Sequence, residues 1–151
     1  MGQVVLMTLG LILGAVFLTA GVYHALRGTP QTWRDPDRAR RTTESLTGFP
    51  FGPEVRRGLV RGAVPMTANM FLLGGGLVCG ALWAGQGTAG GGTLFWAFMA
   101  SVGLTLVSVV LGLLIIWFNV PKALVPPHMR DEVGLVTRRL RDLRERRPHR
   151  G

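Results

Sequence analysis

Few side chains in this sequence have the chemistry that nucleophilic catalysis requires. Such catalysis needs a base within hydrogen-bond reach of a serine or cysteine. The available bases are the three histidines, His24, His128 and His149, which all lie beside charged segments. The available nucleophiles lie within long apolar stretches and are Cys79, Ser101 and Ser108. The sequence therefore predicts no catalytic triad, and we expect the protein not to be an enzyme.

Metal and cofactor sites have equally little support. The single cysteine excludes an internal disulfide and a cysteine-based metal cluster. The histidines lack the spacing of helical metal ligands, although acids of the following loop could approach His24 in space. The glycine-rich stretch Gly74–Gly92 lacks the Gly-Lys-Ser/Thr ending of a phosphate-binding loop. We therefore expect no cofactor and no metal.

The elements that position these residues follow from the distribution of charge. The chain has 151 residues and a formal net charge of +9, yet Met1–Leu26 and Gly62–Pro121 contain no Asp, Glu, Lys or Arg. About 20 apolar residues in a helix span a bilayer. Val4–Leu26 supplies one such span, and the longer stretch supplies two, near Ala63–Ala84 and Leu94–Phe118. The predicted fold is an all-α integral membrane protein with three transmembrane helices.

This reading divides the chain into four segments. Residues 1–26 form the first transmembrane helix, and residues 27–61 form a basic loop with short helices. Residues 62–121 form a transmembrane hairpin that turns at the glycine-rich residues 85–93, where glycine releases the chain from helical geometry. Residues 122–151 form a basic tail with an amphipathic helix.

Basic residues also predict the orientation of the helices, because short loops rich in Lys and Arg stay in the cytoplasm. The loop of residues 27–61 has eight arginines against four acids, and the tail has nine basic residues against four acids. The turn of residues 85–93 has no charge. The amino terminus is therefore expected outside, with both basic segments in the cytoplasm. No Lys or Arg precedes Arg27, which favours an uncleaved first helix over a signal peptide.

Small residues recur at helical spacing in each predicted span. Helices in lipid associate through close packing at small residues and through interhelical hydrogen bonds. The predicted helix-packing residues are Gly10, Gly14, Gly76, Gly80, Ser101, Thr105, Ser108 and Gly112. Chance is the alternative, because the chain has 22 glycines. The amide of Asn69, within the second span, is expected to find an interhelical partner.

Cap and turn residues predict two short helices in the basic loop. Asp35 followed by Pro36 is typical of a helix start, and so is Gly52 followed by Pro53. Pro65 is expected to kink or break the chain where it enters the second span.

The tail contains a short amphipathic basic helix. Its apolar residues Val133, Val136, Leu140 and Leu143 recur at intervals of three and four. The arginines around them are predicted to bind anionic lipid and are Arg138, Arg139, Arg141, Arg144, Arg146 and Arg147. Packing on the other loop and docking of a partner stay open. Nucleic acid is not expected as a partner, because the segment has no aromatic interleaving and no DNA-binding motif.

The segment between the third span and this helix is NVPKALVPPHM, residues 119–129. It resembles a Pro-Lys-x-Leu-Val-Pro-Pro-His segment in small, uncharacterised multi-pass membrane proteins of high-GC Gram-positive bacteria. The resemblance implies a location in the bacterial cell membrane and carries no activity or site residue.

These observations favour a non-enzymatic integral membrane protein that acts by association, as an accessory subunit or a small homo-oligomer, through the glycine and serine faces of its helices. The partners expected are membrane lipids, anionic on the cytoplasmic side, and a membrane protein or a second copy. The alternative is an oligomeric pore, holin-like or part of a transporter. Its polar lining would be Asn69, Ser101, Thr105 and Ser108. The long loop of residues 27–61 departs from the holin pattern.

Overall fold

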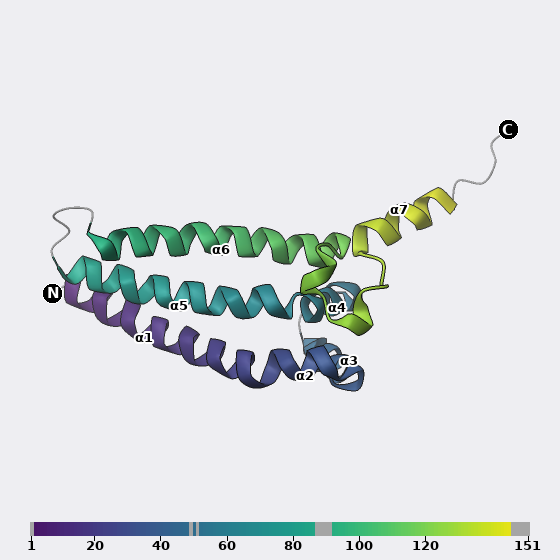
Figure 1. The fold of residues 1–151 in the computed structure, drawn as a ribbon, viewed down its shortest axis with the longest axis horizontal. Helices are drawn as coiled ribbons and strands as arrows, with labels where there is room; N and C mark the ends of the chain where they lie inside the picture. The colour runs from purple at the N-terminus through teal and green to yellow at the C-terminus, as the bar shows by residue number, and fades with distance from the viewer. Residues whose placement is uncertain (1, 49, 51, 87–91, 146–151) are drawn as a thin grey trace. The chain divides into compact units, whose positions relative to one another are not determined.

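The computed structural model describes residues 2–48, 50, 52–86 and 92–145. Every regular element in this part of the chain is helical (Figure 1), which confirms the all-α prediction. The α-helices are α1 (Gly2–Tyr23), α2 (Thr29–Arg34), α3 (Pro36–Ser45), α4 (Pro53–Arg61), α5 (Ala63–Gly85), α6 (Thr93–Phe118) and α7 (Leu135–Glu145).

Three helical stretches are long and apolar enough to cross a membrane: Gly2–Arg34, Ala63–Gly85 and Thr93–Phe118. The first consists of α1, a π-helical turn at His24–Gly28, and α2. The second and third agree closely with the predicted spans. Most of the predicted turn, residues 87–91, lies outside the described residues.

The chain folds into two compact units. Unit 1 comprises Met1–Gly28 and Met66–Val109, and unit 2 comprises Thr29–Pro65 and Val110–Gly151. Apart from Arg27, every charged side chain belongs to unit 2. The division into units therefore coincides with the division of charge.

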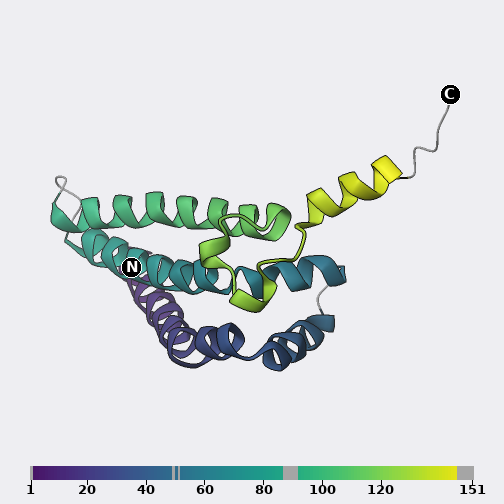
Figure 2. The same ribbon diagram turned by 45° about the vertical axis from the view of Figure 1, so that its right-hand side comes forward.

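In unit 1, α1 and α6 both pack on α5, which lies between them (Figures 1 and 2). Backbones approach closely on both sides of α5: a Cβ added at Gly10 of α1 would lie 2.9 Å from the Cβ of Ala81. On the other side, a Cβ added at Gly80 would lie 3.1 Å from Cδ2 of Phe98 in α6. At one end of α1, Gln3 Nε2 donates a hydrogen bond of 2.6 Å to the carbonyl of Ala84.

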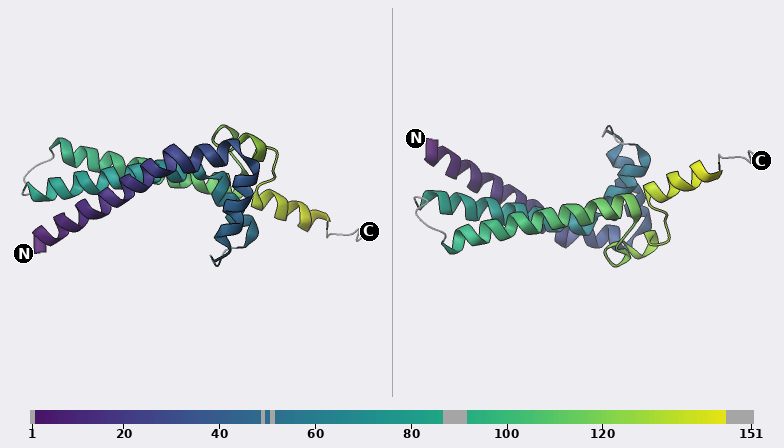
Figure 3. Two further views of the ribbon diagram at one scale, coloured as in Figure 1. Left: turned by 90° about the horizontal axis from the view of Figure 1, so that it is seen from below. Right: turned by 90° about the horizontal axis from the view of Figure 1, so that it is seen from above.

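Unit 2 has a small apolar core of its own. Its buried members come from α3, α4, the last turns of α6 and the segment after α6, and are Ala39, Val60, Ile115, Val125 and Met129. Leu46 and Leu124 pack against them. Figure 3 shows these short elements around the end of α6. Ile115 therefore contributes to a core of short polar helices although it lies in an apolar span.

Local signals explain where the helices of unit 2 begin. The carboxylate of Asp35 accepts hydrogen bonds from the backbone N–H groups of Asp37 and Arg38, at 2.9 and 3.1 Å, and Pro36 occupies the first turn of α3. The predicted helix starts at Asp35–Pro36 and Gly52–Pro53 are both confirmed.

The interruption predicted at Pro65 lies earlier in the chain. α4 ends at Arg61, the chain turns at Gly62, and Pro65 is the third residue of α5. A proline is tolerated there because the first N–H groups of a helix have no intrahelical acceptor. Glycine, with its low helix propensity, makes the break instead.

The chain after α6 is held by one asparagine. Asn119 has a φ of 58°, a left-handed conformation that asparagine tolerates better than most residues. Its Nδ2 donates to the carbonyls of Met129, Arg130 and Glu132, at 3.3, 3.2 and 2.6 Å. The segment NVPKALVPPHM, residues 119–129, contains two 3-10 turns, Lys122–Leu124 and Pro127–Met129.

Candidate functional site

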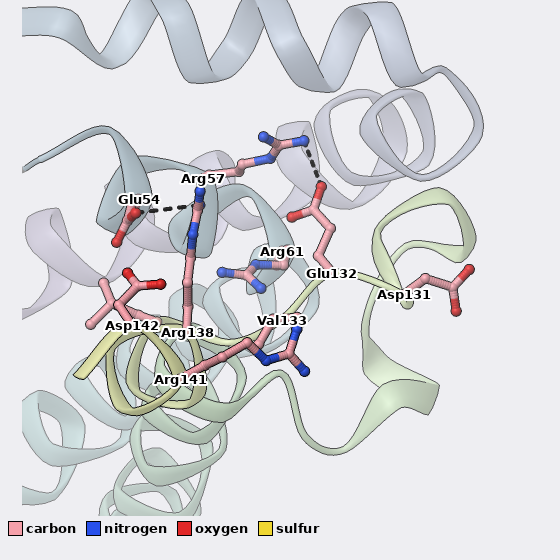
Figure 4. Close-up of a pocket in the computed structure, with 10 residues that line it drawn as sticks. Glu54, Arg57, Arg61, Asp131, Glu132, Val133, Arg138, Arg141 and Asp142 are labelled. Atoms are coloured by element: carbon pink, nitrogen blue, oxygen red, sulfur yellow. Dashed lines mark ion pairs between the residues drawn. The ribbon is translucent and has the colours of Figure 1, made fainter. Parts of the chain in front are cut away.

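A cavity of about 410 Å³ lies in unit 2 among α4, α7 and the residues before α7 (Figure 4). Most of its lining is charged. The lining residues are Glu54, Arg57, Arg61, Asp131, Glu132, Val133, Leu135, Arg138, Arg141 and Asp142.

Helical spacing brings these side chains together. Glu54, Arg57 and Arg61 recur at intervals of three and four in α4, so they share one face of that helix. Arg138 and Arg141 are related in the same way in α7. The residues before α7 form the wall of the cavity between α4 and α7. Asn119 holds this segment through its hydrogen bond to the carbonyl of Glu132.

Two ion pairs cross the cavity. Arg57 Nη2 lies 2.6 Å from Glu132 Oε1, and Arg138 Nη1 lies 3.4 Å from Glu54 Oε1 (Figure 4). The arginine side chains are about 60% exposed in both pairs, at 60% and 63%. Each pair is therefore expected to contribute only about 0–1 kcal/mol to stability. Each ion pair engages one of the carboxylates that line the cavity, Glu132 or Glu54.

Arg61 differs from the other lining arginines because it is only 3% exposed. Its Nε and Nη1 atoms are buried and have no hydrogen-bond partner in the described part of the chain. Burial lowers the pKa of the Arg61 guanidinium from its ordinary value; Glu132 and Glu54 raise that pKa, and Arg57 lowers it. A guanidinium stays protonated in proteins, so the site holds a desolvated positive charge.

Sequence reasoning grouped Arg61 with the other arginines of α4 and did not distinguish it. The 3, 4 spacing of Glu54, Arg57 and Arg61 was the available signal. Burial of one arginine among several depends on how the rest of the chain packs, and Arg61 directly follows Val60, which belongs to the core of unit 2.

The structure divides the predicted lipid-binding arginines into three groups. Arg138 and Arg141 line the cavity. Arg139 and Arg144 are exposed on α7. Arg146 and Arg147 lie outside the described residues.

The apolar stripe of the tail is only partly on the helix. α7 begins at Leu135, so Val133 precedes it and the predicted stripe starts one turn too early. The residue before α7 is Gly134, where a Cβ would lie 2.5 Å from the carbonyl oxygen of Trp117, so only glycine fits at this close approach. Leu140 and Leu143 are 62% and 59% exposed. Their apolar surface has little cover within the chain.

The predicted glycines of the first span lie against α5. A Cβ at Gly14 would be 2.7 Å from Cγ2 of Val78 and 2.9 Å from the carbonyl oxygen of Gly74. Conversely, a Cβ at Gly74 would be 2.9 Å from the carbonyl oxygen of Gly14. Gly74 belongs to the glycines of residues 74–80 that the sequence predicts as a surface for backbone contact, but the sequence did not predict α1 as its partner.

The predicted glycines of the second span lie on another side of α5. A Cβ at Gly76 would be 2.6 Å from Oγ of Ser101, and Gly80 faces Phe98. The Ser101 hydroxyl donates a hydrogen bond to the carbonyl of Leu72. These small residues therefore serve contacts within unit 1.

The remaining polar and packing residues predicted in α5 and α6 have different environments. Ser108 is buried, and the Oγ1 of Thr105 is buried without a hydrogen-bond partner among the described residues. Asn69 Oδ1 also has no such partner, so the expected interhelical bond to this oxygen is not formed. At Gly112 an added Cβ would meet no atom within 4 Å, so no neighbouring helix of this chain packs closely at that residue, and its packing against a partner or second copy stays a prediction.

The candidate catalytic residues are dispersed. His24 and His128 are exposed, Cys79 is a free thiol in α5, and His149 lies outside the described residues. Among the described residues, no group of three or more His, Cys, Asp and Glu side chains is arranged to hold a metal ion.

No protein-family model, curated protein or solved structure matches this chain.

Proposed function

We propose that this chain is a non-enzymatic multi-pass protein of the bacterial cell membrane that acts by association. In this proposal the amino terminus is outside and the charged segments of unit 2 are in the cytoplasm. The supporting observation is that unit 2 contains every charged side chain except that of Arg27, while the three apolar spans supply unit 1. Basic segments that flank spans are retained in the cytoplasm.

The structure favours unit 2 as the part that meets a partner or a lipid surface. Gly10, Gly14, Gly76 and Gly80 already face neighbouring helices in unit 1, so close packing there supports the protein's own fold. Unit 2 instead exposes Leu140 and Leu143 beside the arginines of α7. Such a helix suits the surface of a membrane containing anionic lipid. A membrane-protein partner or a second copy would meet the same unit.

The orientation is tested by thiol labelling in intact cells. Cys79 is first replaced (Cys79→Ala), and then Thr88→Cys and Thr137→Cys are made separately. A membrane-impermeant maleimide should label the protein with Thr88→Cys and leave the protein with Thr137→Cys unlabelled until the cells are opened. The opposite labelling pattern would overturn the orientation.

Association is tested by purifying the full chain in mild detergent. Light scattering should give a mass larger than that of one 16.3 kDa chain after correction for detergent, or a partner should co-purify in a fixed ratio. A single chain without a partner would contradict the proposal. Dye release from vesicles that contain the purified protein would support the pore alternative instead.

A further inference from the structure

We propose that the cavity in unit 2 binds a phosphate group, with Arg61 and Arg141 as its principal ligands. This binding site goes beyond the proposed association and does not depend on the orientation of the protein in the membrane.

The first observation is the state of Arg61. This side chain is 3% exposed, and its Nε and Nη1 have no partner within the described chain. Figure 4 shows its guanidinium among the lining side chains, between Arg138 and Glu132. A buried charge without hydrogen-bond partners is costly, and native proteins pair such groups. An anion in the cavity that Arg61 lines would compensate this positive charge and offer acceptors to the guanidinium.

Glu132 and Glu54 raise the pKa of Arg61, but no acidic residue of the cavity accepts a hydrogen bond from its Nε or Nη1 in the described part of the chain. Glu132 pairs with Arg57, and Glu54 pairs with Arg138. Asp131 points away from the other lining side chains in Figure 4. Asp142 forms no ion pair with Arg61 or Arg141 among the described residues, so it leaves both cations to an added anion.

The ligand chemistry follows from the arginines. A guanidinium presents N–H donors in a planar fork that matches the oxygens of phosphate and carboxylate groups. A phosphate group has enough oxygens to accept bonds from two arginines on different helices, here Arg61 of α4 and Arg141 of α7. The volume of about 410 Å³ accommodates a phosphate group together with part of the molecule that bears it.

The phosphate has two potential sources, the headgroup of an anionic lipid and a soluble phosphate compound. Both offer the same group to the arginines, so one experiment with two arms separates them. The protein is purified as the full chain. In the first arm, inorganic phosphate is titrated into protein in a neutral detergent at constant ionic strength, and binding is measured by calorimetry. In the second arm, protein in phosphatidylcholine nanodiscs, with or without phosphatidic acid, is analysed for retained phosphatidic acid.

Three variants carry the test. Arg61→Gln removes the buried charge, and Arg141→Gln removes the charge of an exposed side chain that forms no ion pair among the described residues. Arg144→Gln is the matched control, since it makes the same change on α7 outside the cavity. Arg61→Gln and Arg141→Gln should each weaken binding about tenfold or more, the loss expected for a hydrogen bond to a charged group. Arg144→Gln should leave binding unchanged.

Each outcome of this experiment either supports or overturns the phosphate site. Binding of inorganic phosphate that is lost in the two cavity variants supports a soluble ligand. Retention of phosphatidic acid that is lost in these variants, without displacement by inorganic phosphate, supports a lipid headgroup. If neither probe binds, or if Arg144→Gln weakens binding as much as Arg61→Gln and Arg141→Gln, the cavity is not a phosphate site.

Discussion

Asn119 donates a hydrogen bond of 2.6 Å to the backbone carbonyl of Glu132, and the Glu132 carboxylate lies 2.6 Å from Arg57. The end of α6 is thereby linked to α4 through the residues before α7. This connection positions one wall of the cavity in unit 2. The cavity therefore depends on Asn119, which does not line it.

Replacement of Asn119 should therefore loosen unit 2. Asn119→Ala removes the bonds to the carbonyls of Met129, Arg130 and Glu132 and places a less suitable residue at a φ of 58°. We expect a loss of about 2–4 kcal/mol, since a buried hydrogen bond contributes about 1 kcal/mol and left-handed backbone costs about 1–2 kcal/mol. Thermal unfolding in detergent, followed by circular dichroism, measures this loss. Asn119→Gly, which tolerates the backbone conformation, should lose less; a larger loss would contradict the explanation.

Two adjacent glycines of α5 provide a matched pair for helix packing. A Cβ at Gly74 would lie 2.8 Å from Cγ of Leu18, whereas a Cβ at Gly75 would meet nothing within 4 Å. Gly74→Ala should therefore destabilise the protein by about 1–3 kcal/mol, the usual effect of overpacking. Gly75→Ala should be neutral or stabilise by up to about 1 kcal/mol, because alanine is the better helix former. Equal shifts in the midpoint of thermal unfolding would refute the α1–α5 contact.

Arg61 should limit the stability of the protein when no anion is bound. Burial is the largest cause of its lowered pKa and outweighs the favourable influence of Glu132. Arg61→Met should stabilise the anion-free protein by about 1–4 kcal/mol, as when other buried charges are replaced by apolar residues of similar volume.

The pH dependence of this difference has a definite sign. A basic group whose pKa is lower in the folded than in the unfolded state destabilises the folded protein while the group stays protonated. This destabilisation is relieved only as the pH rises through the folded-state pKa. A guanidinium stays protonated across the neutral range. The stability gained by Arg61→Met should therefore be constant over that range. A gain that disappears near neutral pH would contradict a permanently charged Arg61.

The end of α7 should contact anionic lipid. A fluorophore sensitive to polarity, attached to Leu143→Cys in the Cys79→Ala background, should report a more apolar environment in nanodiscs with anionic lipid than in neutral nanodiscs. Each well-placed arginine should contribute about 1 kcal/mol, and salt should reverse the effect. Replacement of Arg139 and Arg144 by glutamine should weaken it. The same emission in both lipids would favour docking to a protein instead.

The sequence predicted those elements whose causes are local. The three spans depend on apolar length, and the start of α3 depends on Asp35 and Pro36, so composition and spacing sufficed. The position of the break before α5 was misplaced because Pro65 and Gly62 are both helix-breaking signals, and the structure uses Gly62.

The features that sequence reasoning missed depend on residues distant in the chain. Gly74 matters because Gly14 lies opposite, and no pattern within α5 shows which of its glycines faces α1. Gly58 was missed for the same reason: a Cβ there would lie 2.8 Å from Cγ2 of Ile116 in α6. The burial of Arg61 likewise arises only when residues after α6 cover α4.

The core of unit 2 also constrains how the protein is made. Ala39 and Val60 are synthesised early, yet they share their core with Ile115 and Val125, which leave the ribosome much later. Until then, α3 and α4 lack the apolar side chains that α6 and the segment after it contribute to the core. A nascent chain that stops before residue 110 should therefore be a substrate for chaperones and proteases, and completion of the last span becomes the step at which quality control can release the protein.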